Sequence, residues 1–408
     1  MKKTWFIAFW FLTLQASAQD PLREYLSQAA ENNLGLKAKY AAFEASLERV
    51  AQASGLPDPT LSFGYFIKPV ETRVGPQRMK FSLSQMFPWF GSLSAKGDAA
   101  AAVAQANYLQ FIDAREKLMS ELKSDYYKLW ELQKLIKLEN ENLEILKSYQ
   151  ELTTSRISSG TAKLSDAYRV QIQMEESATN LKILNDQMAP LQRVFNRQIN
   201  REVDAMVTLI DTIEVSEQAL VSTDSLSHPS VAKYTELQKG AEFQSKAAKK
   251  SGLPKIGVGV DYVVVDERTD MVVPDNGNDV VMPMVSISLP IWRKQYSGAI
   301  KSAEFMKKQY QLDAQNEWDL LESKRDMQFY ELQQANDEMK LYSEEITLVN
   351  KTLELVITDY TNDRVEFEEV LRLQQKLIQY KKLKLMAYRK YLDKQAVMEY
   401  LNYNVNEQ

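Results

Sequence analysis

The sequence predicts a mainly α-helical chain with a small β part, in which one set of elements occurs twice. The first observation is that "SGLPDPTLSFGY" at residues 54–65 returns as "SGLPKIGVGVDY" at residues 251–262, which is 197 positions later. The second is that apolar and small residues alternate after each copy, which is typical of strands. The third is that a long stretch with helical spacing follows each alternating segment. Together these features indicate an internal duplication that covers the whole chain.

The alternating segments predict one β-hairpin in each half, at about residues 57–88 and 254–290. Successive strand residues point to opposite faces, so each hairpin has one large apolar face and one face of small or polar residues. This pattern is typical of strands that line a water-filled transmembrane barrel. Four strands are fewer than the eight of the smallest closed barrels. We expect Phe63, Tyr65, Val258, Val260 and Ile287 to face lipid, and Ser82, Ser84, Gly257 and Ser286 to face the lumen.

Two long helices are predicted, at about residues 92–155 and 293–360. The first stretch has no proline and a single glycine, and its apolar residues recur mostly at steps of three and four, as in coiled coils. At 1.5 Å per residue such a helix is about 95 Å long. A helix of that length is not expected inside a globular domain of this size, but a coiled coil or a helical tube contains such helices.

Each long helix is followed by a tight turn and a returning helix. The turns are expected at about residues 156–166 and 361–366, and the pattern aligns Gly160 with Asp363. Gly160 permits a sharp reversal, and Asp166 lies where a helix begins again. The predicted organisation is therefore a first repeat over residues 19–200, a linker over 201–224 and a second repeat over 225–408.

The N-terminus predicts export. Two lysines precede a short apolar stretch, and Ala16-Ser17-Ala18 matches a signal-peptidase site, so residues 1–18 are interpreted as a signal peptide. The net charge of −5 argues against a nucleic-acid partner. The Lys381–Lys384 run and the paired carboxylates, such as Glu175-Glu176 and Glu368-Glu369, are interpreted as solvated helix faces.

The residues that common catalytic and metal sites require are scarce. Cysteine is absent and His228 is the single histidine, so neither a thiolate nor a multi-histidine metal site can form, and no Cys-His pair is possible. His228 precedes Pro229 and is interpreted as the start of a helix, with Ser227 as its N-cap. We expect no enzyme activity, no cofactor and no metal site.

This order of elements, with the signal peptide and "LSQMFPWFGSLSAK" at the first strand-to-helix junction, resembles the TolC-like outer-membrane efflux protein family. The resemblance implies a homotrimer with a 12-stranded barrel in outer-membrane lipid and an α-helical tunnel across the periplasm. It also implies an exit duct for a tripartite efflux or type I secretion system, with a periplasmic adaptor (membrane fusion) protein and an inner-membrane pump as partners. The sequence does not specify the substrate.

The resemblance further implies that the two helical turns form the periplasmic end, which closes the tunnel and docks the adaptor. The matching residues are Arg156, Gly160, Thr161, Leu164, Asp363 and Arg364. Our hypothesis for the gate is a ring of Asp363 carboxylates, with Arg364 as the partner whose pairing holds the helix ends shut. For these two residues the alternative is that both are exposed turn residues. The alternative is a periplasmic coiled-coil adaptor or scaffold without a channel. An adaptor usually has a single helical hairpin flanked by small β domains, so the duplicated hairpins favour the channel.

Overall fold

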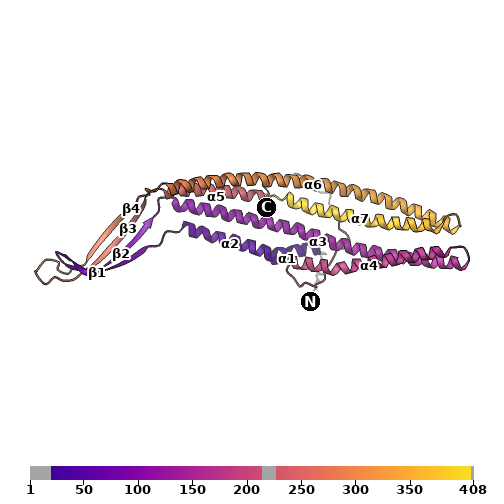
Figure 1. The fold of residues 1–408 in the computed structure, drawn as a ribbon, viewed down its shortest axis with the longest axis horizontal. Helices are drawn as coiled ribbons and strands as arrows, with labels where there is room; N and C mark the ends of the chain where they lie inside the picture. Colours follow the sequence, from indigo (N-terminus) through magenta and orange to yellow (C-terminus); the bar gives the residue numbers. More distant parts are fainter. Residues whose placement is uncertain (1–19, 214–226, 406–408) are drawn as a thin grey trace, which may run out of the picture. The chain divides into compact units, whose positions relative to one another are not determined.

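The computed structural model describes residues 20–213 and 227–405 (Figure 1). The expected signal peptide, and residues 214–224 of the expected linker, lie outside these ranges. The elements are α1 (Pro21–Asn32), α2 (Leu34–Ser54), β1 (Thr60–Thr72), β2 (Gly75–Phe87), α3 (Ser92–Ser158), α4 (Leu164–Gln198), α5 (Pro229–Ser251), β3 (Lys255–Val265), β4 (Val280–Ser288), α6 (Lys294–Thr361) and α7 (Phe367–Leu401).

The predicted duplication is visible in this order of elements. The series α2, β1, β2, α3 and α4 of the first repeat is matched by α5, β3, β4, α6 and α7 of the second. The two long helices contain 67 and 68 residues and run slightly past the predicted ends at 155 and 360. Helix α1 has no counterpart within the described part of the second repeat.

The compact units of the molecule do not coincide with the repeats. One unit, here called the helical unit, comprises the described residues of 20–37, 115–213 and 323–402. The other, the sheet unit, comprises those of 38–114, 227–322 and 403–405. Each unit thus combines segments from both repeats, because elements of the two repeats pack against each other, as β2 does with β3.

The sheet unit contains one four-stranded antiparallel sheet in the order β1-β2-β3-β4. Its register aligns residues of all four strands in rows, and successive rows lie on opposite faces of the sheet. One row joins Leu61, Leu83, Val260 and Pro283. The neighbouring row on the opposite face joins Ser62, Ser82, Asp261 and Met282. The duplicated hairpins therefore form a single sheet with one continuous apolar face.

The core of the helical unit is built around Tyr126 and Phe195, which are fully buried among side chains of α1, α3, α4 and α7. The described part of the linker lies against this core. Its Ile210 amide donates to the Tyr126 hydroxyl over 3.0 Å, and Val207 and Ile213 are buried. Burial raises the pKa of Tyr126 to about 12. The linker thus takes part in the core, which its weak sequence pattern did not predict.

A second core lies beside the two helical turns. It is formed by apolar residues of α3, α4, α6 and α7, among which Val170, Phe367 and Val370 are almost completely buried. The rings of Tyr360 and Phe367 lie 5.0 Å apart across the second turn. This packing fixes the ends of the helices from which the turns project.

Candidate functional site

The two helical turns have the same backbone geometry. Gly160 and Asp363, which the sequence pattern aligned, have φ angles of 75° and 59°. In the first turn the Thr161 amide donates to the Arg156 carbonyl over 2.9 Å, and in the second the Arg364 amide donates to the Asp359 carbonyl over 3.0 Å. This six-to-one hydrogen bond after a left-handed residue ends many helices. Glycine adopts that conformation freely and aspartate tolerates it, so one backbone solution serves both repeats.

The side chain of Arg156 joins the two turns. Its guanidinium donates to the Tyr360 carbonyl over 2.8 Å and forms an ion pair with Asp363. It also lies over the Tyr360 ring, 4.5 Å from the ring centre. Burial raises the pKa of the Tyr360 hydroxyl. We call these three residues the arginine clasp.

The partner of Asp363 differs from the predicted one. We expected Arg364 to hold Asp363, but Arg364 pairs with Asp359 over 3.3 Å, within its own turn. The reason is geometric, since the left-handed conformation at Asp363 is followed by a residue that bonds back to the preceding helix. Asp363 is thereby free to reach Arg156 of the first repeat.

Two further ion pairs connect the first turn with the second. Lys163 reaches Glu366 over 2.9 Å, and Arg169 reaches Glu368 over 2.9 Å. The other predicted turn residues lie at the surface. Thr161 donates its hydroxyl to the Arg156 carbonyl over 3.2 Å, and the Leu164 side chain is 60% exposed. The predicted turn residues are therefore brought together. Glu366 and Tyr360 are additions that the sequence did not single out, and Glu368 was predicted only as part of a solvated helix face.

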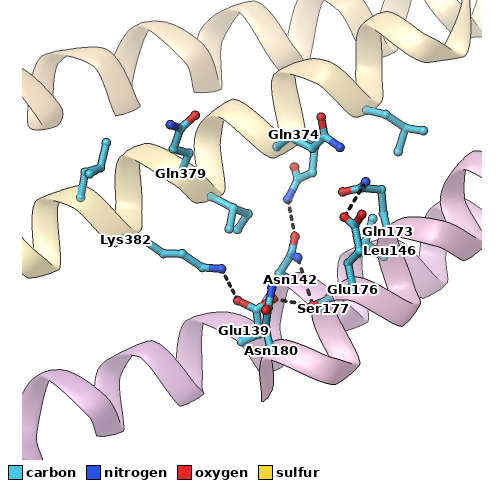
Figure 2. Close-up of a pocket in the computed structure, with 14 residues that line it drawn as sticks. Glu139, Asn142, Leu146, Gln173, Glu176, Ser177, Asn180, Gln374, Gln379 and Lys382 are labelled. Atoms are coloured by element: carbon cyan, nitrogen blue, oxygen red, sulfur yellow. Dashed lines mark hydrogen bonds and ion pairs between the residues drawn. The ribbon is translucent and has the colours of Figure 1, made fainter. Parts of the chain in front are cut away.

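A polar cavity of about 310 Å³ lies within the helical unit between α3, α4 and α7 (Figure 2). The buried carboxylate of Glu139 forms an ion pair with Lys382 over 2.6 Å and accepts the Ser177 hydroxyl over 2.8 Å. Asn142 donates to Ser177 and accepts from Gln374, both over 3.3 Å. The network links the two helical hairpins, because α3 and α4 belong to one and α7 to the other.

This cavity corrects the interpretation of the Lys381–Lys384 run as a solvated face. Lys382 turns inward to Glu139, which is 1% exposed. A buried carboxylate is costly unless it is paired and hydrogen-bonded, which explains why four polar residues gather around Glu139. The carboxylates of Glu368 and Glu369 stay solvated as predicted, with 67% and 38% of their side chains exposed, and they pair with Arg169 and Arg372 respectively. The sequence could not show these partners, because they lie on other helices or depend on the side-chain conformation.

The sheet register confirms which residues share a face. Phe63, Tyr65, Val258, Val260 and Ile287 lie on the apolar face, and Ser82, Ser84, Gly257 and Ser286 lie on the opposite one. The apolar side chains are strongly exposed, with 61% of Phe63 and 63% of Ile287 accessible. The polar face carries an ion pair between Lys80 and the fully buried Asp261. A face of exposed apolar side chains of this extent marks an interaction surface.

His228 proves to be the N-cap of α5 in place of Ser227. Its Nδ1 accepts the Ser230 amide over 3.3 Å, and Pro229 occupies the first helical position. The histidine is fully buried. Proline at the first helical position makes the preceding residue the cap, which explains the shift by one.

Residues 20–213 and 227–405 contain neither a metal-binding cluster nor a helix that could span a membrane. No group of three or more histidine, aspartate or glutamate side chains in these ranges could hold a metal ion. Among the described helices, none combines the length and the apolar character that a bilayer crossing requires.

Comparison with known proteins identifies the fold through structure alone. No protein-family model matches the chain, and no curated protein is similar to it in sequence. A membrane protein from Pseudomonas aeruginosa aligns with a TM-score of 0.77 and 13% identity over 95% of this chain and 94% of that one. The outer membrane protein VceC from Vibrio cholerae gives 0.75 and 13% over 94% and 96%. The open state of the MtrE outer membrane channel of Neisseria gonorrhoeae gives 0.73 and 14% over 94% and 89%.

These alignments cover nearly the whole of each chain, including the sheet and the paired long helices. The protein therefore has the fold of the TolC-like outer-membrane channels, as the sequence pattern predicted. At such low identity the alignments establish the fold, and the roles of single residues depend on the contacts described above.

Proposed function

We propose that this protein is the outer-membrane exit duct of a tripartite efflux or type I secretion system. The observation that carries this proposal is the apolar face of the sheet. Its side chains are exposed although they are large, and the opposite face carries serine, glycine and the paired Asp261 together with Met86, Met282 and Met284. Apolar residues outside and polar residues inside are the arrangement of a transmembrane barrel strand.

The four strands would form one third of a barrel in a homotrimer. Strands β1 and β4 are the edges of the sheet, and neither has a partner on its outer side within the described chain. Open edges favour pairing with another chain. Pairing β1 of one copy with β4 of the next in a three-fold ring would close a barrel of 12 strands, which exceeds the minimum of eight.

The helical unit carries matching features for a ring. Leu164, Tyr168 and Ile172 form an exposed apolar stripe on α4 with a spacing of four. A second exposed stripe on α6, with a spacing of seven, consists of Leu341, Leu348 and Leu355. Two different stripes that bind each other head to tail produce a closed ring when the rotation closes. Three copies would thereby surround a tunnel.

The stripes can be tested through the mass of the assembly in detergent. Leu348→Glu places a charge in the α6 stripe, and we expect it to shift the trimer towards monomer in analytical ultracentrifugation. Asn350→Glu adds the same charge at an exposed position two residues on, on another side of the helix, and should leave the trimer intact. Equal effects of the two substitutions would remove the α6 stripe from the interface.

The helical turns are proposed as the periplasmic end that docks the adaptor and closes the tunnel. Arg156, Gly160, Thr161, Leu164, Asp363 and Arg364 lie together there, which supports the predicted tip. We revise the gate, because Asp363 is held by Arg156 and not by Arg364. Opening the tunnel would then require the arginine clasp to separate.

The membrane placement of the sheet can be tested with single cysteines, since the chain has none of its own. Val258→Cys places a thiol on the apolar face and Ser286→Cys places one on the polar face. In outer-membrane vesicles we expect a charged, water-soluble maleimide to label position 286 and not position 258. Rapid labelling of position 258 in intact membranes would contradict the proposed facing. Recovery of the protein in the inner membrane would instead favour an adaptor or scaffold.

A further inference from the structure

A second pocket, of about 380 Å³, lies in the sheet unit where strand β2 leads into helix α3. It is lined by the end of α2, the start of α3 and the end of α5. Three of its lining residues are lysines, namely Lys96, Lys250 and Lys255. None of the three forms an ion pair with a residue in the described part of the chain. We call this site the lysine pocket.

The lysine pocket also contains a buried hydroxyl group without a partner. Ser92 lines the pocket and is 1% exposed. Its Oγ has no hydrogen-bond partner among the described residues. A buried hydroxyl that makes no hydrogen bond is destabilising, so an acceptor from outside the chain would satisfy it.

The first turn of α3 adds a backbone donor. Helix α3 begins at Ser92, and the first amides of a helix have no partner within it. The Ser92 amide donates to the Trp89 carbonyl over 2.9 Å, and the Ala95 amide donates to the Gly91 carbonyl over 3.1 Å. Leu93 lines the pocket, and its amide has no acceptor within the described ranges. The positive end of the helix dipole lies at the same place and favours an anion.

Gly91 brings one lysine to this helix start. It has a φ angle of 72°, and a Cβ atom placed on it would lie 2.2 Å from Nζ of Lys250. The ammonium group of Lys250 therefore lies directly against the turn before α3. Glycine serves two purposes here, because it adopts the left-handed conformation and leaves room for the lysine.

The duplication provides an internal comparison for these charges. Lys250 and Lys255 flank the second SGLP motif, and the residues in the same places around the first motif are Ala53 and Asp58. Lys96 is the fifth residue of α3, and the fifth residue of α6 is Gly298. The three lysines are thus absent from the equivalent positions of the other repeat, so the duplication does not account for their clustering.

We propose that the lysine pocket binds a phosphate group. Three ammonium groups supply positive charge, and the Ser92 hydroxyl and the free Leu93 amide supply hydrogen-bond donors, which together match the oxygens of a phosphate. Trp89 lines the pocket, and Phe90 and Trp292 are exposed beside the strand ends. Aromatic residues gather at the level of lipid headgroups. A phospholipid headgroup is therefore one source of the phosphate, and this source rests on the proposed membrane function; free phosphate is the other.

The test uses the full-length protein in a non-ionic detergent with two probes. Isothermal titration calorimetry measures the binding of inorganic phosphate, and native mass spectrometry counts bound phosphatidylglycerol. The test variant replaces Lys96, Lys250 and Lys255 by glutamine. The control variant replaces Lys249, Lys301 and Lys308, which are exposed lysines of the same unit and do not line the pocket, so both variants have the same net charge.

Whichever probe the unmodified protein binds, we expect the test variant to bind it at least about tenfold more weakly, because charge-assisted hydrogen bonds are lost. The control variant should stay within about twofold of the unmodified protein. Ser92→Ala should weaken binding by a smaller factor. Binding of both probes would identify the phosphate group alone as the ligand, and binding of phosphatidylglycerol only would identify a lipid headgroup. Binding of neither probe, or equal losses in the test and control variants, would overturn the proposal. Channel conductance in planar bilayers is a separate measurement, so a failed pocket and a failed channel can be told apart.

Discussion

The four-stranded sheet and the pair of helical turns differ in whether their surface side chains find partners within the chain. On the apolar face of the sheet, large side chains such as Phe63 and Ile287 are exposed and have no covering layer within the described chain. At the turns, charged side chains such as Arg156 and Asp363 are paired within the chain. The sheet therefore depends on its surroundings, whereas the turns depend on the identity of a few residues.

The comparison also separates what the two repeats share from what they do not. Both repeats contribute equally to the apolar face, as the row of Leu61, Leu83, Val260 and Pro283 shows. At the turns the backbone is shared, but only the second repeat has a carboxylate at the left-handed position. The two repeats therefore share the apolar face of the sheet, whereas their turns differ in the residue at the left-handed position.

The largest effect is expected on the sheet, for Val258→Arg. A charge on the lipid-facing side of a barrel near the middle of the bilayer costs about 2–4 kcal/mol. Urea unfolding in lipid vesicles should show this loss in the free energy of unfolding. Ser286→Arg is the matched control on the polar face, and it should change the conductance while leaving stability nearly unaltered. Similar losses of stability in both variants would show that the two faces are not in different environments.

A smaller effect is expected at the arginine clasp, for Arg156→Leu. The substitution removes a hydrogen bond to the Tyr360 carbonyl, an ion pair and a contact with the Tyr360 ring, which together contribute about 1–2 kcal/mol. Hydrogen exchange of the turn amides should become faster by about tenfold, while exchange in the core around Tyr126 stays the same. If the turn amides exchanged at the wild-type rate, the arginine clasp would not hold the turns together.

Gly160→Ala should cost about 1 kcal/mol, because alanine is strained in the left-handed conformation. No other atom lies within 4 Å of the position that the new Cβ would take, so the cost is purely one of backbone conformation. Asp363→Asn in the second turn is the comparison variant, because asparagine tolerates the left-handed conformation and the substitution removes only the negative charge. Local hydrogen exchange measures both. An unaltered exchange rate in Gly160→Ala would contradict the account of the turn geometry.

The smallest effect is expected for Lys163→Ala. Its ion pair with Glu366 is exposed on both sides, and exposed pairs contribute about 0–1 kcal/mol. The variant should exchange its turn amides within about threefold of the wild-type rate. A loss as large as that of Arg156→Leu would mean that the exposed pairs, and not the arginine clasp, connect the two turns.

The sequence predicted the architecture well because periodicity is a local property. Alternation over the strands and the apolar steps over the long helices identified both hairpins and both long helices of the duplicated series, and the alignment of Gly160 with Asp363 is matched by their common backbone conformation. The same offset of 203 residues relates Gln171 to Gln374, yet Gln171 is exposed and bonds to Glu175, while Gln374 is buried and bonds to Asn142. The environment of such residues depends on which helices pack together.

The sites were predicted less completely than the fold for the same reason. The ion pair between the buried Glu139 and the partly exposed Lys382 joins helices that are separated by more than 200 residues of sequence, and neither residue interrupts the local pattern of its helix. The partner of Asp363 was misassigned to its neighbour Arg364, because sequence proximity was the only guide. The lysine pocket likewise combines residues from both repeats, which only the folded chain brings together.

The most direct test of the central claim is single-channel recording with the purified protein in planar lipid bilayers. If the apolar face of the sheet contacts lipid and three copies close a barrel, the protein will produce discrete conductance steps, and Ser286→Arg will change the size of each step. Arg156→Leu will raise the resting conductance of each channel, because it separates the two turns. A trimeric protein that inserts into the bilayer but gives no steps would contradict the claim that the sheet forms a channel.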